Sequence, residues 1–197
     1  MRIDKRLLDR LLPTVLSFAL ASGVAFAQQG GSAPSATDAK FMKEAAAANM
    51  AEVEVGRLAS EKAASTDVRD FGRMLVDDHS KALDELKSLA SKKNVTLPTE
   101  PTAEQKAEKA RLSKLSGKAF DDAFAKAMVG DHDKAVKLFR DEHTSGSDRE
   151  TKTWAGNTLP TLEKHRDEAQ KLAGNKSASH HKSGHARASK KSAPPQP

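Results

Sequence analysis

Residues 117–144 read GKAFDDAFAKAMVGDHDKAVKLFRDEHT, and their apolar side chains recur at intervals of three and four positions. Such spacing places one apolar stripe along one face of an α-helix. A single ionisable residue, His132, interrupts the stripe near its middle. The segment therefore predicts a long amphipathic helix that packs against other helices. Its stripe consists of Phe120, Phe124, Met128, His132, Ala135 or Val136, and Phe139.

Three further segments show the same periodicity, and no segment shows the alternation that is typical of a β-strand. Each of their stripes is also interrupted once near mid-helix, by Glu52, His79 and His165 in turn. In a bundle of helices of similar length, these positions and His132 share one layer. The stripes are Phe41, Ala45, Ala48, Glu52, Val55 and Ala59 in 37–64; Val68, Phe71, Leu75, His79, Ala82, Leu86 and Leu89 in 67–93; and Trp154, Thr158, Leu162, His165, Ala169 and Leu172 in 147–174.

The lengths of the connections predict how the helices are paired. Short connections join the first helix to the second and the third to the fourth, which makes each pair an antiparallel hairpin. Residues 95–116 form a longer connection with two prolines and a short polar helix that begins near Thr102. The expected fold is all-α, a four-helix bundle of two antiparallel hairpins joined by a long crossover with a short extra helix.

Residues at the segment ends predict where the helices begin and end. Thr37 is expected to cap the first helix, and Ser147-Asp148-Arg149-Glu150 has the S-x-x-E pattern of a capping box for the fourth. Asn94 is expected to end the second helix, because asparagine tolerates the left-handed conformation found at helix C-termini. The fourth helix is expected to end at Gly174.

The first 27 residues have the three parts of a secretory signal. A basic head precedes an apolar stretch of 17 residues, 11–27, that ends in Ala25-Phe26-Ala27. The alternative is an uncleaved membrane anchor, but the stretch contains Pro13 and is shorter than the roughly 20 residues of a bilayer span. The pattern predicts cleavage near Ala27-Gln28, a mature chain without a transmembrane span, and a periplasmic or extracellular location.

The formal net charge of +6 resides in the two ends of the chain, since residues 28–174 carry a net charge of −1. This distribution argues against a specific nucleic-acid partner for the fold. Residues 28–36 are a linker by composition, and 37–174 are expected to form the bundle. Residues 175–197 contain no large apolar residue and are expected to be a disordered basic tail. The tail is a candidate for contact with anionic envelope surfaces, or for weak metal capture through its histidines.

The mid-helix layer is the candidate site, and three interpretations remain open. Glu52, His79, His132 and His165 are hypothesised to bind a transition metal, and such imidazole-rich sets suit Zn, Cu, Fe or Ni. Alternatively, the layer is a structural one in which histidine rings bond carboxylates and fix the helix register. The third interpretation is a proton-active or ligand-binding site. Candidates for orienting the metal ligands are Asp78, Asp131 and Glu168.

A short repeat supports the layer. Residues 76–82 and 129–135 share the pattern V-x-D-H-x-K-A, which indicates pseudo-symmetry between the hairpins and places an aspartate beside each of two histidines. These motifs, Leu97-Pro98 and the segment TLPTLEKH at 158–165 resemble the exported bacterial domain-of-unknown-function family forty-one forty-two, over about residues 38–173. The resemblance implies a ferritin-like four-helix bundle but no established activity. The Glu-x-x-His pairs of di-iron ferritin-like sites are absent, since Val76, Val129 and Leu162 stand three residues before the histidines.

The composition and the motifs argue against several classes of enzyme. The chain has no cysteine, which excludes disulfides, thiolate metal sites and cysteine nucleophiles, and it lacks G-x-S-x-G, P-loop, dinucleotide-binding and H-E-x-x-H motifs. We therefore expect a non-enzymatic, exported binding or stress-associated protein. The alternatives are a metal-binding bundle and a module that associates with the envelope surface through its tail. The sequence names no partner and leaves room for a homo-oligomer.

Overall fold

The computed structural model describes residues 34–182, and within that range the chain is helical without a β-strand. The all-α helical bundle expected from the periodicity is confirmed. Four helices are long and lie close to the predicted segments, and the short extra helix follows the two prolines. The helices are α1 (Ala36–Lys62), α2 (Thr66–Lys92), α3 (Ala103–Ser113), α4 (Gly117–Ser145) and α5 (Arg149–Lys182).

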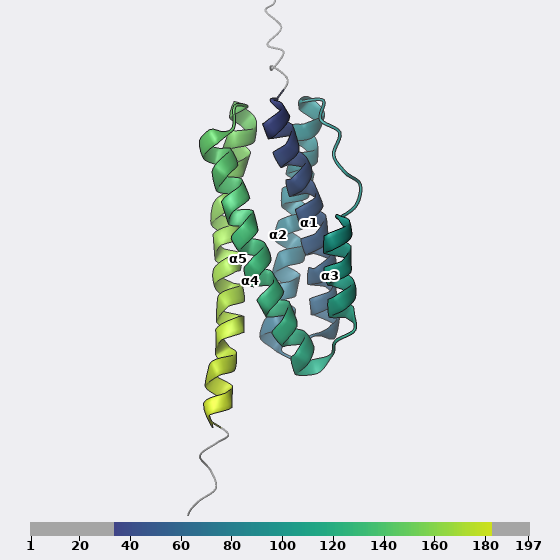
Figure 1. Ribbon diagram of the computed structural model, residues 1–197, viewed down its shortest axis with the longest axis vertical. Coiled ribbons are helices and arrows are strands. Elements are labelled where there is room, and N and C mark those ends of the chain that lie inside the picture. Colours follow the sequence, from purple (N-terminus) through teal and green to yellow (C-terminus); the bar gives the residue numbers. More distant parts are fainter. Residues whose placement is uncertain (1–33, 183–197) are drawn as a thin grey trace, which may run out of the picture. The chain divides into compact units, whose positions relative to one another are not determined.

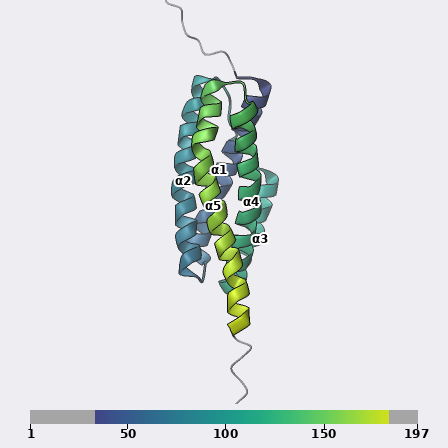
Figure 2. The ribbon, with the colours of Figure 1, turned by 90° about the vertical axis from the view of Figure 1, so that its left-hand side faces the viewer.

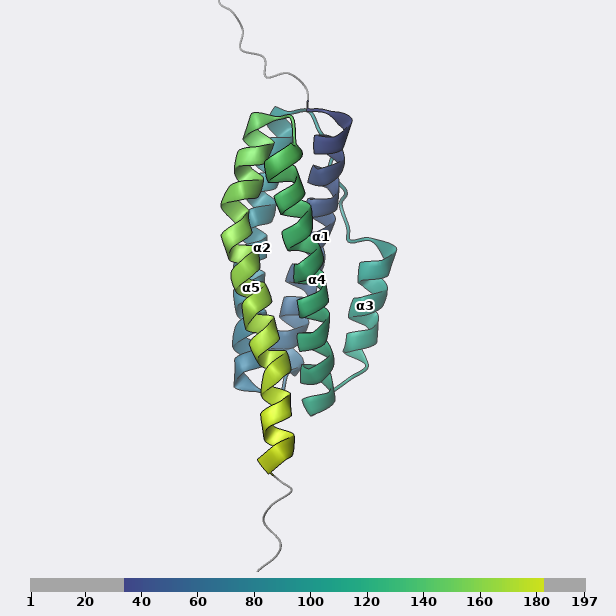
Figure 3. The same ribbon diagram turned by 60° about the vertical axis from the view of Figure 1, so that its left-hand side comes forward.

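Two hairpins make up the bundle. α1 packs along α2 and α4 packs along α5, while α1 also contacts α4 and α2 contacts α5. In Figure 1, α2 ends at the same end of the bundle where α1 begins, and the connection through α3 descends to the opposite end before α4 starts. In Figure 2, which is turned by 90° from Figure 1, α5 lies between α2 and α4. The short helix α3 lies outside the four long helices, beside α1 and α4 (Figure 3).

The helix starts differ in two places from the predicted caps. The N-cap of α1 is Ser35 and not Thr37, because the Ser35 side chain accepts a hydrogen bond from the Asp38 N–H and Asp38 accepts one from the Ser35 N–H. At α5 the cap is Asp148, whose carboxylate accepts from the Thr151 N–H at 2.9 Å. Ser147 and Glu150, the expected capping-box pair, bind Asp38 and Lys93 instead.

The end of α2 agrees with the prediction, and the end of α5 does not. Asn94 follows α2 with φ 55°, in the left-handed conformation expected at a helix end. α5, however, continues past Gly174 to Lys182, so the predicted helix end at 174 is wrong. No proline occurs between 174 and 182 to stop the helix. The signal segment 1–27 and residues 183–197 of the tail lie outside the described residues.

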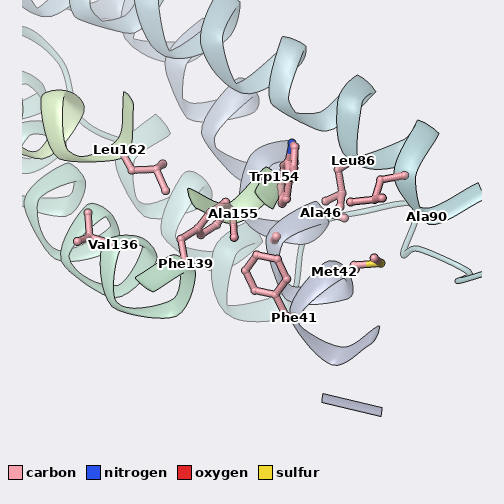
Figure 4. Packing of buried hydrophobic residues seen from close by; sticks show 12 residues of the cluster. Phe41, Met42, Ala46, Leu86, Ala90, Val136, Phe139, Trp154, Ala155 and Leu162 are labelled. Carbon is pink, nitrogen blue, oxygen red and sulfur yellow. The ribbon is translucent and has the colours of Figure 1, made fainter. Parts of the chain in front are cut away.

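Two apolar clusters fill the bundle, one toward each end. The first surrounds Phe41, Phe139 and Trp154, whose ring centroids are 5.0–6.0 Å apart, and Figure 4 shows these side chains gathered between the helices. The second contains Phe71 and Phe124, at 6.1 Å, together with Leu112 from α3. Burial of these side chains is the main favourable term for folding. The three mid-helix histidines lie between the two clusters.

Each hairpin turn is held by an aspartate from the other hairpin. Asp38, near the start of α1, is fully buried and accepts hydrogen bonds from the Ser147 N–H, the Ser147 hydroxyl and the Asp148 N–H. Asp121, near the start of α4, accepts from the Ala64 and Ser65 N–H groups at 3.0 and 2.8 Å. These contacts set the register of one hairpin against the other at both ends of the bundle.

The helices of the first hairpin approach each other most closely at two glycines. A Cβ atom at Gly56 would lie 2.7 Å from the Gly72 carbonyl oxygen, and one at Gly72 would lie 2.7 Å from the Gly56 carbonyl oxygen and 2.9 Å from the Ala59 Cβ. Because backbone atoms form this contact, a larger residue can be accepted only if the helices separate. Between residues 34 and 182, no helix combines the length and the apolar character needed to cross a bilayer.

Gly72→Ala is expected to lower the free energy of unfolding by about 1–3 kcal/mol, because the added methyl group forces α1 and α2 apart. Urea unfolding followed by circular dichroism measures the change. Gly130→Ala is the matched control, since a Cβ atom there meets nothing within 4 Å. The control should be neutral or stabilising by about 1 kcal/mol, as alanine is the better helix former. Equal stabilities of Gly72→Ala and the wild type would contradict the close-approach explanation.

Candidate metal centre

Three histidines from three helices meet at the centre of the bundle. His79 of α2, His132 of α4 and His165 of α5 have 5%, 1% and 0% of their surface exposed. Their ring centroids are 5.2–5.6 Å apart. One potential ligand atom from each residue lies within 4.8 Å of the others. The predicted convergence of these histidines is therefore what the structure shows.

One nitrogen of each ring is hydrogen-bonded to an oxygen of the protein. His79 Nδ1 lies 2.9 Å from the Asn49 side-chain oxygen, and the Asn49 amide nitrogen donates to the Ala45 carbonyl. His132 Nδ1 lies 2.9 Å from the Met128 carbonyl oxygen, and His165 Nε2 lies 2.9 Å from Asp78 Oδ2. All three oxygens are acceptors, so the ring nitrogen must supply the hydrogen in each bond.

The other nitrogen of each ring has no hydrogen-bond partner. These atoms are His79 Nε2, His132 Nε2 and His165 Nδ1, and all three are buried. A neutral imidazole has one N–H, and here it is used in the bond to the protein oxygen. The unpartnered nitrogens are therefore lone-pair acceptors, which is the tautomer that a metal ligand requires.

The surroundings keep the three rings neutral. Burial lowers the pKa of His79 well below its usual value, and the neighbouring His132 and His165 lower it further. Burial and His165 lower the pKa of His132 to about 4. Burial also lowers the pKa of His165, although its bond to Asp78 acts in the opposite direction. The site can thus present three uncharged nitrogen ligands at neutral pH.

Glu52, the fourth residue predicted for the site, is buried but is not part of the ligand set within 4.8 Å. Its Oε2 atom is buried without a hydrogen-bond partner. Burial, followed by the nearby carboxylate of Asp131, raises the pKa of Glu52 to about 8. Glu52 therefore lies near the histidines as a largely protonated acid in the metal-free protein.

The predicted orienting residues match the structure at one position of three. Asp78 orients a ring, but the ring is that of His165 and not the neighbouring His79. Asp131 pairs with Lys134 and Glu168 pairs with Lys171, and the hydrogen bonds of the three histidine rings go to other residues. Adjacent residues of a helix point about 100° apart, so an aspartate beside a histidine in the sequence faces another direction. Asn49 is the orienting residue that the sequence pattern missed.

The two copies of the V-x-D-H-x-K-A repeat lie at different places in their hairpins. One copy lies in α2, the second helix of its hairpin, and the other in α4, the first helix of its hairpin. The pseudo-symmetry between the hairpins stays a prediction. The reciprocal contacts of Asp38 and Asp121 with the opposite turns are the feature that the hairpins share.

A cleft of about 1060 Å³ leads to two of the histidines. Most of its lining residues come from α1, α3 and α4, Glu52 and His132 among them, and His79 of α2 and Leu162 of α5 contribute too. Six of the lining residues are alanines, whose small side chains occupy little of the space. These alanines are Ala48, Ala51, Ala107, Ala123, Ala127 and Ala135.

Comparisons with known proteins identify the family and support the fold. A family model described as Domain of unknown function (DUF4142) matches residues 24–172. A solved structure entitled "Crystal structure of DUF305 fragment from Deinococcus radiodurans" is similar, with a TM-score of 0.66 and 13% sequence identity over 73% of this chain and 99% of that chain. At this identity the likeness shows the fold alone. No curated protein matches the chain.

Glu52→Gln is expected to stabilise the metal-free protein increasingly as the pH rises. The native state holds a proton on Glu52 with a pKa of about 8, whereas the unfolded state releases it near 4.5, so the wild type loses stability between these values. Glutamine removes that loss, and the variant should gain on the order of 2–4 kcal/mol over the wild type between pH 5 and pH 8. Urea unfolding in the presence of a chelator measures the difference.

The matched control is Glu54→Gln in the same helix, where Glu54 pairs with Lys109 and is 36% exposed. Its stability relative to the wild type should hardly change between pH 5 and pH 8. A stability difference for Glu52→Gln that is equally independent of pH would show that this carboxyl is not protonated through burial.

Proposed function

The chain belongs to the family of the Domain of unknown function (DUF4142), and from its own residues we propose that it binds a transition-metal ion through His79, His132 and His165. The observation that carries this proposal is that the two nitrogens of each ring have different roles. One nitrogen donates to a protein oxygen, and the other is a buried lone pair without a partner. Ligand histidines of metal sites commonly have this arrangement.

A purely structural layer explains the same residues less well. Such a layer is stable when its buried polar atoms satisfy one another, but here three buried acceptors on rings 5.2–5.6 Å apart have no donor. Each buried acceptor without a partner costs about 1–3 kcal/mol. A cation at the centre would satisfy all three at once.

The chemistry of the ligands favours particular metals. Neutral imidazoles suit Zn²⁺, Cu²⁺, Fe²⁺ or Ni²⁺, whereas Mg²⁺ and Ca²⁺ prefer oxygen ligands. Three protein ligands leave at least one coordination position for water or another small molecule. The cleft beside His79 and His132 provides space for such a molecule.

The proposal includes an exported, non-enzymatic role. Export is supported by the basic head, apolar stretch and Ala25-Phe26-Ala27 of the first 27 residues. A binding role is supported by the lack of hydrolase, phosphate-loop and dinucleotide-binding motifs in the sequence. Fractionation of cells that produce the full chain, with mass spectrometry of its N-terminus, tests export and cleavage near Ala27.

The mature chain is expected to contain close to one equivalent of metal, and the triple substitution His79→Ala, His132→Ala and His165→Ala should lose it, because the ligands are gone. Elemental mass spectrometry of untagged protein measures the content, before and after incubation with Zn²⁺, Cu²⁺, Fe²⁺ or Ni²⁺. His143→Ala is the control, since His143 lies in α4 outside the site.

The tail histidines need a separate control, because they can also capture metal. His180→Ala, His181→Ala and His185→Ala together should leave the single tight equivalent unchanged. A wild-type protein that retains no metal after any of the incubations would overturn the proposal and favour the structural layer.

Removal of an orienting residue should weaken the site without removing a ligand. Asn49→Ala and Asp78→Ala each delete the acceptor of one ring N–H, so the ring loses its orientation and its preferred tautomer. Metal affinity is expected to fall about 10–100-fold in each variant. Competition with a chelator of known affinity measures this effect, and Asp77→Ala beside Asp78 serves as the control. Unchanged affinity in both variants would show that the oxygens do not support the ligands.

A further inference from the structure

We infer that the cleft between α1, α3 and α4 is the entry route for the metal ion, and that Glu52 is a relay group that receives the ion before the histidines do and releases its carboxyl proton to water as it does so. This inference rests on the proposed metal site and adds how an ion reaches a centre that is buried in the bundle. The cleft is the opening on which His79 and His132 both lie. His165, the third ligand, is not among its walls and completes the site from behind.

Carboxylates follow the cleft from its mouth to its floor. Glu104 of α3 is exposed, Glu108 of α3 and Asp131 of α4 have side chains 33% and 39% exposed, and Glu52 of α1 is only 8% exposed. At the floor His132 is 1% exposed. Of these four carboxylates, Glu52 is the one that is buried, and it lines the cleft together with His79 and His132.

The same carboxylates act on one another through their charges. Burial raises the pKa of Asp131, Lys134 lowers it, and the negative charges of Glu108 and Glu104 raise it to a smaller extent. Burial and then the charge of Asp131 raise the pKa of Glu52. Negative charge that is concentrated between apolar walls focuses the electric field and raises the local concentration of cations. The ion pairs of Arg111 with Glu108 and of Lys134 with Asp131 offset part of this negative charge, and Lys126 is exposed to solvent.

Glu52 itself provides the observation that is independent of this acidic series. The Glu52 side chain lines the cleft and is 92% buried, and its Oε2 atom has no hydrogen-bond partner. A buried carboxyl oxygen without a hydrogen-bond partner is costly, whether it carries the proton or not, unless a ligand or an ion satisfies it. Its position on the same wall as His79 and His132, but outside their ligand set, fits a transient ligand better than a permanent one.

Stopped-flow mixing of the metal-free mature chain with Co²⁺, a spectroscopic substitute for Zn²⁺, tests the route. The visible absorption of bound Co²⁺ gives the association rate constant, and chelator-driven loss gives the dissociation rate constant. A relay lowers the barrier in both directions, so Glu52→Gln should reduce both rate constants about tenfold or more. Their ratio, the dissociation constant, should change less than about threefold, because the three final ligands remain.

Four further variants sharpen the result. Asp131→Asn should slow association several-fold, whereas Asp133→Asn should not, because Asp133 lies in the same helix but outside the cleft. Gly130→Leu fills part of the cleft without a change of charge and should slow both uptake and release, because a Cβ atom at Gly130 points into open space. Gly130→Ala is its control.

The outcomes separate this inference from the proposed function. A wild type that takes up no Co²⁺ overturns both the metal site and the route. Normal uptake with unchanged rate constants in Glu52→Gln and Gly130→Leu overturns only the route. Faster dissociation of Co²⁺ from Glu52→Gln with unchanged association also overturns the relay, because it makes Glu52 a ligand of the bound ion.

Discussion

A neutral imidazole has two nitrogens and only one proton, and the centre of this bundle depends on where that proton resides. The ring nitrogen that carries the proton donates a hydrogen bond to a side-chain amide oxygen in His79, to a backbone carbonyl in His132 and to a carboxylate in His165. The other nitrogen of each ring is thereby left as a buried lone pair without a hydrogen-bond partner. Burial keeps the rings uncharged, so the arrangement is available over the ordinary pH range.

The rest of the fold positions these rings. The apolar clusters lie on both sides of the histidine layer, and each hairpin turn is bound by an aspartate of the opposite hairpin. The register of α2 against α4 and α5 therefore does not depend on the layer itself. A polar layer within a core that is held from both ends can be organised for binding rather than for stability.

The sequence predicted the helices and the three histidines well because large apolar residues mark the buried faces of α2, α4 and α5. α1 was harder to orient. Its run Ala45–Ala48 offers no contrast in side-chain size, so the predicted stripe passes through Ala48, whereas the buried residue of that turn is Asn49. For the same reason the position of Glu52 relative to the histidines could not be predicted. Contacts between distant segments, such as that of Asp38 with the α4–α5 turn, leave no local pattern in the sequence.

The two glycines that bring α1 against α2 also have a mechanical consequence. They bring the backbones of α1 and α2 into direct contact, while the seam between α1 and α4 contains the cleft. His79 belongs to the first hairpin, whereas His132 and His165 belong to the second. A metal ion bound by all three histidines would cross-link the two hairpins. The rigidity of the seam between α1 and α4 would then depend on whether the ion is bound.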